Sequence, residues 1–336
     1  VGESRLHRYG AVEAIISRST EMTEMSFRVQ STLYGRWMAD LPEGSLNRGN
    51  ILRRWESANA QLQLLQQQSS EERGPSIRHL ETRDQHGFAV MQTPHFTFHH
   101  RMDPRQAEQL GQLAEAAWSS AAARWFSGVP YNGIPPHSNA RTEVFIYPNT
   151  QSYIQQTRVD QAIPGHHLVN FGGQNNVSRR ININAESGQP MADVLTHEVG
   201  HAVIAGIFTQ TWRPIGVDEG MAHQMAPSAT IASYERRTRQ AFSGTAGHTR
   251  FTAEQLLTAQ QSPPINRPET VLDFHAQSAS LVSFLVGRRD APTFTRFVSD
   301  CQRVGAEAAL RTHLGFASYQ QLQSAWEAAV GGSGGR

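Results

Sequence analysis

Hydrophobic residues in the N-terminal part of the chain recur at helical spacing. Residues 11–38 are compatible with a helix, and a second run places apolar residues at alternating steps of four and three: Ile51, Trp55, Ala58, Leu62 and Leu65. Steps of this kind gather apolar side chains on one helical face. The pattern predicts a helical hairpin that ends in a polar linker, so that residues 1–88 form a hairpin and linker.

The rest of the chain mixes strand and helix patterns. Three short segments alternate as strands do, namely HFTFHHR (95–101), TEVFIYP (142–148) and RRININ (179–184). Residues 104–126 have the spacing of a long amphipathic helix, and the apolar residues after residue 248 have helical spacing interrupted by Pro and Gly. We therefore predict an α+β domain over residues 89–330 with a mostly helical C-terminal part, followed by a flexible tail at 331–336.

Composition narrows the classes of partner and of metal site. The 30 basic residues nearly balance the 29 acidic ones, which argues against binding to nucleic acid. The sequence has no apolar run long enough to predict a membrane span. Cys301 is the single cysteine, so a metal site would have to use histidine and carboxylate ligands.

The sequence HEVGH at residues 197–201 is a candidate metal motif. In a helix, His197 and His201 lie one turn apart on the same face, so both imidazoles can reach one ion. Glu198 lies on the same side, where it can contact a water bound to that ion. Pro190 suits the first position of such a helix, and residues 194–207 contain no Pro.

The sequence DEG at residues 218–220 supplies a candidate third ligand. A catalytic zinc site takes three protein ligands, and Glu219 follows His201 after a segment with the Pro and Gly needed for a return turn. Asp218 is then a helix cap or a hydrogen-bond partner of a histidine. We expect Glu219 on a second helix facing the first, with Gly220 allowing the two helices to approach closely.

Other histidines lack this spacing. We expect His95, His99, His100, His166 and His167 to be surface or strand residues and not ligands. The segment RRININ would serve as an edge strand that can pair with an extended peptide.

The segments LTHEVGHAV (195–203) and RPIGVDEGMA (213–222) resemble the gluzincin metallopeptidases, and more narrowly the peptidase MA-like domains often found in bacterial extracytoplasmic proteins. The resemblance implies a zincin-like domain in which His197, His201 and Glu219 bind Zn²⁺ and Glu198 is the catalytic base. It also implies an extracytoplasmic location. His275 stands where a Tyr often begins a late helix of that family.

These observations predict a zinc-dependent metallopeptidase that hydrolyses peptide bonds, with Glu198 as general base on a zinc-bound water. The substrate would be a peptide or protein. The oxyanion donor stays open among His275, His223, Tyr234 and Tyr153. Two alternatives also stay open, a non-catalytic binding or scaffold protein of the same fold and a zinc hydrolase of a non-peptide amide. The sequence does not determine the oligomeric state.

Overall fold

The chain divides into two compact units, Val1–Ser76 and Ile77–Arg336. A computed structural model describes residues 76–127, 141–161, 163–171, 177–208, 212–226, 228–264 and 266–332. These residues belong almost entirely to the second unit. The predicted N-terminal hairpin, and most of the tail predicted at 331–336, lie outside the described residues.

The described strands form one mixed sheet in the order β1-β2-β3-β4-β6-β5. Their bounds are β1 Arg78–Arg83, β2 Ala89–Gln92, β3 Phe96–His100, β4 Thr142–Tyr147, β5 Gly165–Phe171 and β6 Val177–Asn184. Strands β3, β4 and β6 are parallel neighbours, whereas β1 with β2, β2 with β3, and β5 with β6 are antiparallel. Strand β1 precedes residue 89, so the sheet begins ahead of the domain start drawn from the sequence.

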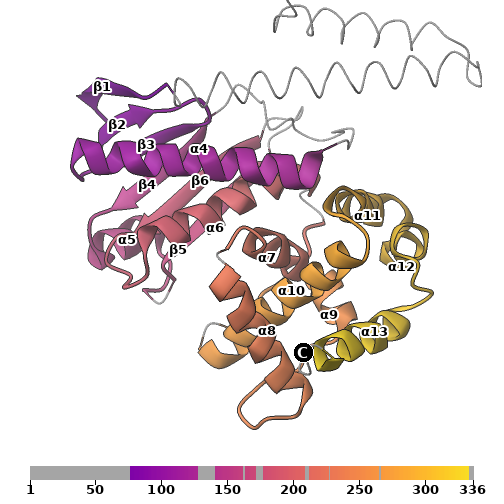
Figure 1. Cartoon of the computed structure of the whole chain (residues 1–336). Coiled ribbons are helices and arrows are strands. Elements are labelled where there is room, and N and C mark those ends of the chain that lie inside the picture. The colour runs from indigo at the N-terminus through magenta and orange to yellow at the C-terminus, as the bar shows by residue number, and fades with distance from the viewer. Residues whose placement is uncertain are drawn as a thin grey trace, which may run out of the picture. The chain divides into compact units, whose positions relative to one another are not determined.

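The two faces of the sheet carry different helices. Helices α4 (Pro104–Phe126) and α6 (Met191–Ile204) cover one face, where they share a hydrophobic core with residues such as Val144 and Ile181 (Figure 1). Helix α5 (Thr150–Thr157) follows β4 directly, and its Tyr153 packs with Tyr147 in a separate cluster on the other face. This division follows from strand alternation, because successive residues of β4 point to opposite faces.

The C-terminal part is helical and lies beside the sheet (Figure 1). Its elements are η1 Ala205–Ile207, α7 Ile215–His223, α8 Ser228–Phe242, α9 Ala253–Thr258, α10 Pro268–Arg288, α11 Ala291–Val304, α12 Ala306–Ala309, η2 Leu310–Leu314 and α13 Tyr319–Gly332. The same core continues into these helices. The hydroxyl of Thr295 in α11, for example, donates to the carbonyl of Trp125 in α4 at 2.8 Å.

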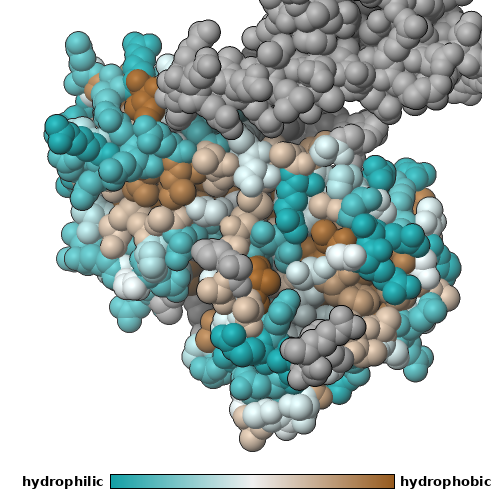
Figure 2. Space-filling model, viewed as in Figure 1, coloured by the Kyte–Doolittle hydropathy of each residue, from teal (hydrophilic) through white to brown (hydrophobic). Residues whose placement is uncertain are grey.

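The surface seen in Figure 2 is mainly hydrophilic over these helices, and hydrophobic residues gather on it near α4. In that helix Leu110 and Leu113 are partly buried against the core. The outward face of α4 is therefore only in part polar.

The α+β class, the helix at 104–126 and the three predicted strands are confirmed. Strands β1, β2 and β5 were not predicted. Two details of the prediction are wrong. Pro190 is the residue that precedes helix α6, not its first helical residue. Gly220 does not face α6, because a Cβ there would lie 2.5 Å from the backbone oxygen of Ser278 in α10. It is Gly200, whose Cβ would lie 3.2 Å from Ala222, that lets α6 and α7 approach.

Candidate metal centre

Helix α6 carries the two histidines of the HEVGH sequence into the interior. The helix packs on β5, β6 and α4, and its apolar residues Leu195 and Val199 are fully buried. His197 and His201 follow one helical turn apart, and their Nε2 atoms lie 3.1 Å from each other. The His201 side chain is 1% exposed and that of His197 is 21% exposed. The pair therefore faces a partly open region from one side of the helix.

Helix α7 brings Glu219 to the same point. Its Oε2 atom lies 3.5 Å from Nε2 of His197 and 3.5 Å from Nε2 of His201. Among the described residues this oxygen is buried and has no hydrogen-bond partner. The three side chains converge closely enough that they could hold one metal ion.

Asp218, the residue before Glu219, contacts the other side of His201. Its Oδ1 lies 2.8 Å from Nδ1 of His201, and its Oδ2 accepts a hydrogen bond from Nε of Arg213 at 2.8 Å. Burial alone would raise the pKa of Asp218, but His201 and Arg213 outweigh it and the pKa is lowered. An ionised carboxylate only accepts hydrogen bonds, so Nδ1 of His201 carries a proton. Burial would lower the pKa of His201, but Asp218 and Glu219 outweigh it and raise that pKa, so Nε2 has to lose a proton before it can bind a metal ion.

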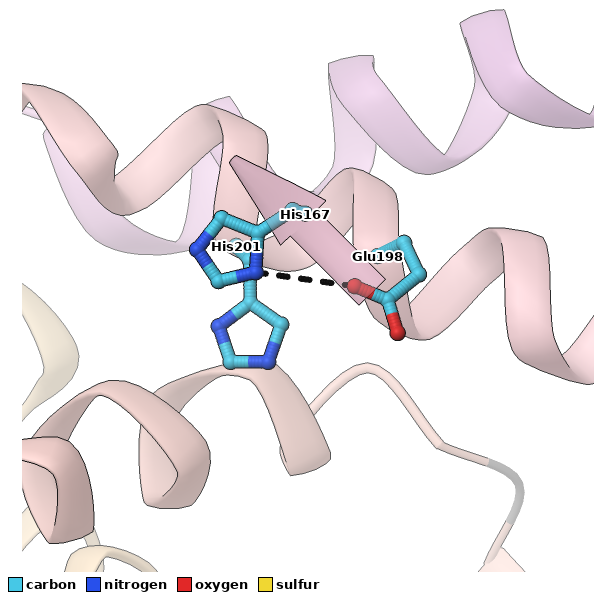
Figure 3. A group of neighbouring side chains, drawn as sticks. All are labelled: His167, Glu198 and His201. Atoms are coloured by element: carbon cyan, nitrogen blue, oxygen red, sulfur yellow. Dashed lines mark ion pairs between the residues drawn. The ribbon is translucent and has the colours of Figure 1, made fainter. Parts of the chain in front are cut away.

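His167, from strand β5, lies beside His201 and contacts Glu198 (Figure 3). Its ring stacks on His201 with centroids 4.2 Å apart, and its Nδ1 lies 3.5 Å from Oε2 of Glu198. Nε2 of His167 accepts a hydrogen bond from Arg213, because a guanidinium can only donate. The ring proton is therefore on Nδ1 and points to Glu198. Burial lowers the pKa of His167 to about 4, so the ring is neutral.

The carboxylate of Glu198 is buried, with its side chain 6% exposed. Burial would raise its pKa, but His167 and the histidines of α6 outweigh this and lower the pKa, which keeps the group ionised. The 3.5 Å contact with His167 is at the outer limit of a hydrogen bond. Among the described residues Oε2 has no closer partner. The carboxylate of Glu198 thus stays ionised beside the His167 ring.

Two further histidines approach Glu219 from its other side. His223 lies one turn after Glu219 on α7, with its Nε2 3.7 Å from Oε2, and Nδ1 of His275 on α10 lies 3.3 Å from the same oxygen. These two histidine nitrogens are 2.9 Å apart. His275 lies about two turns inside α10, which begins at Pro268, so it does not begin that helix.

The two tyrosines named as oxyanion donors lie in different places. The ring of Tyr234, on α8, stands edge-on to His223 with centroids 4.8 Å apart, and burial together with Glu219 raises its pKa to about 12. Tyr153 is fully buried, and its hydroxyl lies 2.8 Å from Nδ1 of His166. Tyr234 thus borders the cluster around Glu219, whereas the hydroxyl of Tyr153 is engaged with His166.

His95, just before β3, and His99 within it make contacts away from this centre. His95 lies 2.6 Å from Glu115 and stacks on Trp118, and His99 lies between Asp84 and Glu143. Of the five histidines that we expected not to be ligands, His167 alone forms a group with Glu198 and His201 among the described residues.

The segment RRININ is not an edge strand, which corrects the prediction. It lies in β6, which is hydrogen-bonded to β4 on one side and to β5 on the other, so it has no free edge for a peptide. Among the described strands β5 occupies that edge of the sheet. Leu168, which is next to His167 in this strand, has an exposed side chain.

The sequence analysis did not predict β5, and it named His223 as a possible oxyanion donor but not as a neighbour of Glu219 and His275. The alternation in GHHLVNF places Gly165 and His167 on one face of a strand, a signal that was present but hidden by the glycines around it. The spacing of Glu219 and His223, four residues apart, repeats that of His197 and His201 on a second helix. Both signals indicate a shared site only once the structure places α6, α7 and β5 next to one another.

Comparisons with known proteins identify no relative: no protein-family model, no curated protein and no solved structure matches the chain. None of the helices in the described residues combines the length and the apolar character needed to cross a membrane.

Proposed function

We propose that this chain is a zinc-dependent metallopeptidase of the gluzincin type with a zincin-like domain. The observation that supports this most strongly is the triangle formed by the Nε2 atoms of His197 and His201 and the Oε2 atom of Glu219. Its edges are 3.1, 3.5 and 3.5 Å. Ligand atoms about 2.0–2.2 Å from a tetrahedral zinc ion lie about 3.3–3.5 Å from one another. The two edges to Glu219 match this range, and the edge between the histidines is slightly shorter.

The chemistry of the donors also fits zinc. Two imidazoles and one carboxylate leave a fourth position for a water or substrate, as in catalytic zinc sites. The contact of Nδ1 of His201 with Asp218 orients the ring so that Nε2 is the nitrogen that faces the proposed ion. The buried Oε2 of Glu219, which lacks a hydrogen-bond partner among the described residues, gains one in a bound cation.

When bound, zinc acts as a Lewis acid and makes water acidic enough to lose a proton near pH 7. Residues of the chain transfer the proton and hold the reacting groups in position. Glu198 takes the proton from the attacking water and returns it to the leaving amine, for which an ionised, buried and oriented carboxylate is suited. His167 holds Glu198 in place from the strand side. Asp218, which accepts a hydrogen bond from Arg213, holds the ring of His201.

Strand β5 is the proposed binding site for the peptide substrate. It is an edge strand among the described strands, and its residue His167 contacts Glu198. An extended peptide that paired with this edge would gain main-chain hydrogen bonds and pass beside the proposed base. This favours a peptide or protein substrate over a small non-peptide amide.

Metal analysis combined with a peptide-library digest tests the proposal. The wild-type protein is expected to bind zinc and cleave peptides, to lose activity in a chelator and to regain it with added zinc. Glu198→Gln should keep its zinc and lose hydrolysis by about 100-fold or more, because the amide keeps the shape but cannot accept the proton. A zinc-loaded protein that cleaves no peptide in the library would instead support a scaffold role, and activity insensitive to chelators would contradict the metallopeptidase proposal.

A further inference from the structure

The side chains around Glu219 form two separate triads. His197, His201 and Glu219 make one, and Glu219, His223 and His275 make the other. Only Glu219 belongs to both. The second triad is not needed for a mononuclear site, because the first already supplies three ligands.

The second triad has the dimensions of a metal site. Its edges are 2.9 Å between Nε2 of His223 and Nδ1 of His275, 3.3 Å from His275 to Oε2 of Glu219, and 3.7 Å from His223 to that oxygen. These values bracket the separation of about 3.3–3.5 Å between ligands of one tetrahedral ion. Two imidazole nitrogens and one carboxylate oxygen are the donors that zinc and neighbouring divalent transition metals accept.

The arrangement of the helices repeats that of the first triad. On α6, His197 and His201 lie one turn apart, and on α7, Glu219 and His223 lie one turn apart, so each helix offers two donors on one face. His275 on α10 closes the second triad, as Glu219 closes the first. The rings of His197 and His223 lie 4.3 Å apart between centroids, so the two triads are immediate neighbours.

The side chains of the second triad are buried enough to form a metal site and are not a cluster on the surface. The side chains of His223, Glu219 and His275 are 9%, 15% and 24% exposed. The ring of Tyr234 stands edge-on to His223 and covers one side of it. Oε2 of Glu219 has four histidine nitrogens within 3.3–3.7 Å, yet among the described residues it accepts no hydrogen bond from any of them.

We infer that His223, His275 and Glu219 bind a second divalent transition-metal ion, with Glu219 bridging it to the first. This inference rests on the proposed function, because it takes the His197 site as the first ion of the pair. Paired metal sites in hydrolases hold their ions about 3.5–4 Å apart, a separation that a shared carboxylate can span. The second ion would add a binding position for an anionic or carbonyl oxygen of the substrate beside the first.

Metal stoichiometry of the full chain tests the inference without any assay of activity. The protein is stripped with a chelator, dialysed against zinc and measured by elemental analysis, with circular dichroism to verify folding. We expect about two zinc ions per wild-type chain and about one in His275→Ala, since the second triad then keeps only two ligands. His223→Gln, which keeps a polar side chain of similar size, is a second variant with the same expected result.

The controls separate the second site from the first. His197→Ala should retain about one ion, held by the second triad, and His313→Ala, which removes a histidine paired with Asp300 far along the chain, should retain about two. In the cobalt-loaded wild type, two bridged ions should couple magnetically and weaken the electron paramagnetic resonance signal per ion, whereas His275→Ala should show the signal of an isolated ion.

Four other results of the metal analysis would overturn the second metal site. One ion in the wild type, kept in His275→Ala and lost in His197→Ala, would overturn the second site and leave the proposed function standing, with His223 and His275 simply hydrogen-bonded to each other. One ion lost in both variants would mean a single ion shared by all four histidines, which also overturns it. Two ions retained in both His275→Ala and His223→Gln would place the second ion elsewhere. No ion in the wild type would remove the proposed function as well.

Discussion

Nδ1 of His201 lies 2.8 Å from Oδ1 of Asp218, and both side chains are almost completely buried. The adjacent Glu219 points instead to the Nε2 side of the same histidine. Neighbouring residues on a helix point about 100° apart, so one acid of the pair contacts each side of the ring. The contact assigns different roles to two residues that the sequence alone presents as similar.

These roles predict different losses of zinc affinity. Asp218→Asn should weaken zinc binding about 10–100-fold, because the neutral amide holds the His201 ring less firmly. Glu219→Ala should weaken it much more, because it removes a proposed ligand. Zinc titration of both folded variants measures this. A tight, stoichiometric site in Glu219→Ala together with an empty one in Asp218→Asn would reverse the assignment.

His167 should affect hydrolysis more than zinc affinity. His167→Phe keeps a ring that can stack on His201 but removes the Nδ1 proton that faces Glu198. We expect the cleavage rate at saturating peptide to fall about 10–100-fold, the range typical of residues that orient a catalytic group, while zinc affinity changes little. His166→Phe, the neighbouring histidine whose ring contacts Tyr153, is the matched control and should cleave normally. Equal rates for both variants would show that His167 does not orient Glu198.

Two glycine-to-alanine changes should have opposite effects on stability. A Cβ at Gly220 would lie 2.5 Å from the Ser278 oxygen and 2.5 Å from Val282, so Gly220→Ala should destabilise the protein by about 1–3 kcal/mol. At Gly287, near the end of α10, no described atom lies within 4 Å of such a Cβ. Gly287→Ala should therefore stabilise by up to about 1 kcal/mol through helix propensity. Urea unfolding of the two variants decides this, and similar stabilities would mean that α7 and α10 pack less closely.

His99 should make the free energy of unfolding depend on pH. Burial lowers its pKa, but the carboxylates of Glu143 and Asp84 outweigh this and raise the pKa above its ordinary value of 6.5. Folding therefore favours the protonated ring. This contribution is fully present below 6.5 and is lost as the pH rises through the raised folded pKa.

Urea unfolding of the wild type and of His99→Gln at about pH 5.5 and about pH 9 measures the effect. The variant should lose more stability relative to the wild type at the lower pH. His86→Gln, at an exposed histidine, is the control and should show no such difference. A larger loss in His99→Gln at the higher pH would contradict the ion pairs of His99.

The sequence by itself determined what depends on neighbours along the chain. The alternation in residues 95–101 and 142–148, and the apolar period in residues 104–126, follow from the geometry of a single strand or helix, and the structure has these elements. The spacing of His197 and His201 likewise follows from one helical turn. Helix α6 alone puts the two side chains on one face, whereas the 3.1 Å separation of their Nε2 atoms also depends on the contact that orients the His201 ring from α7.

Tertiary structure alone decided which elements meet. A strand pattern does not say which strands are neighbours, so RRININ was predicted to be an edge strand. In the structure β5, which the glycines around it made hard to predict, pairs with β6 on its outer side. Gly220 was assigned to the wrong helix for the same reason, because a glycine shows that a close approach is allowed but not with what. His167 and His275 come from β5 and α10, far from the HEVGH sequence, and reach Glu198 and Glu219 only because these elements pack against α6 and α7.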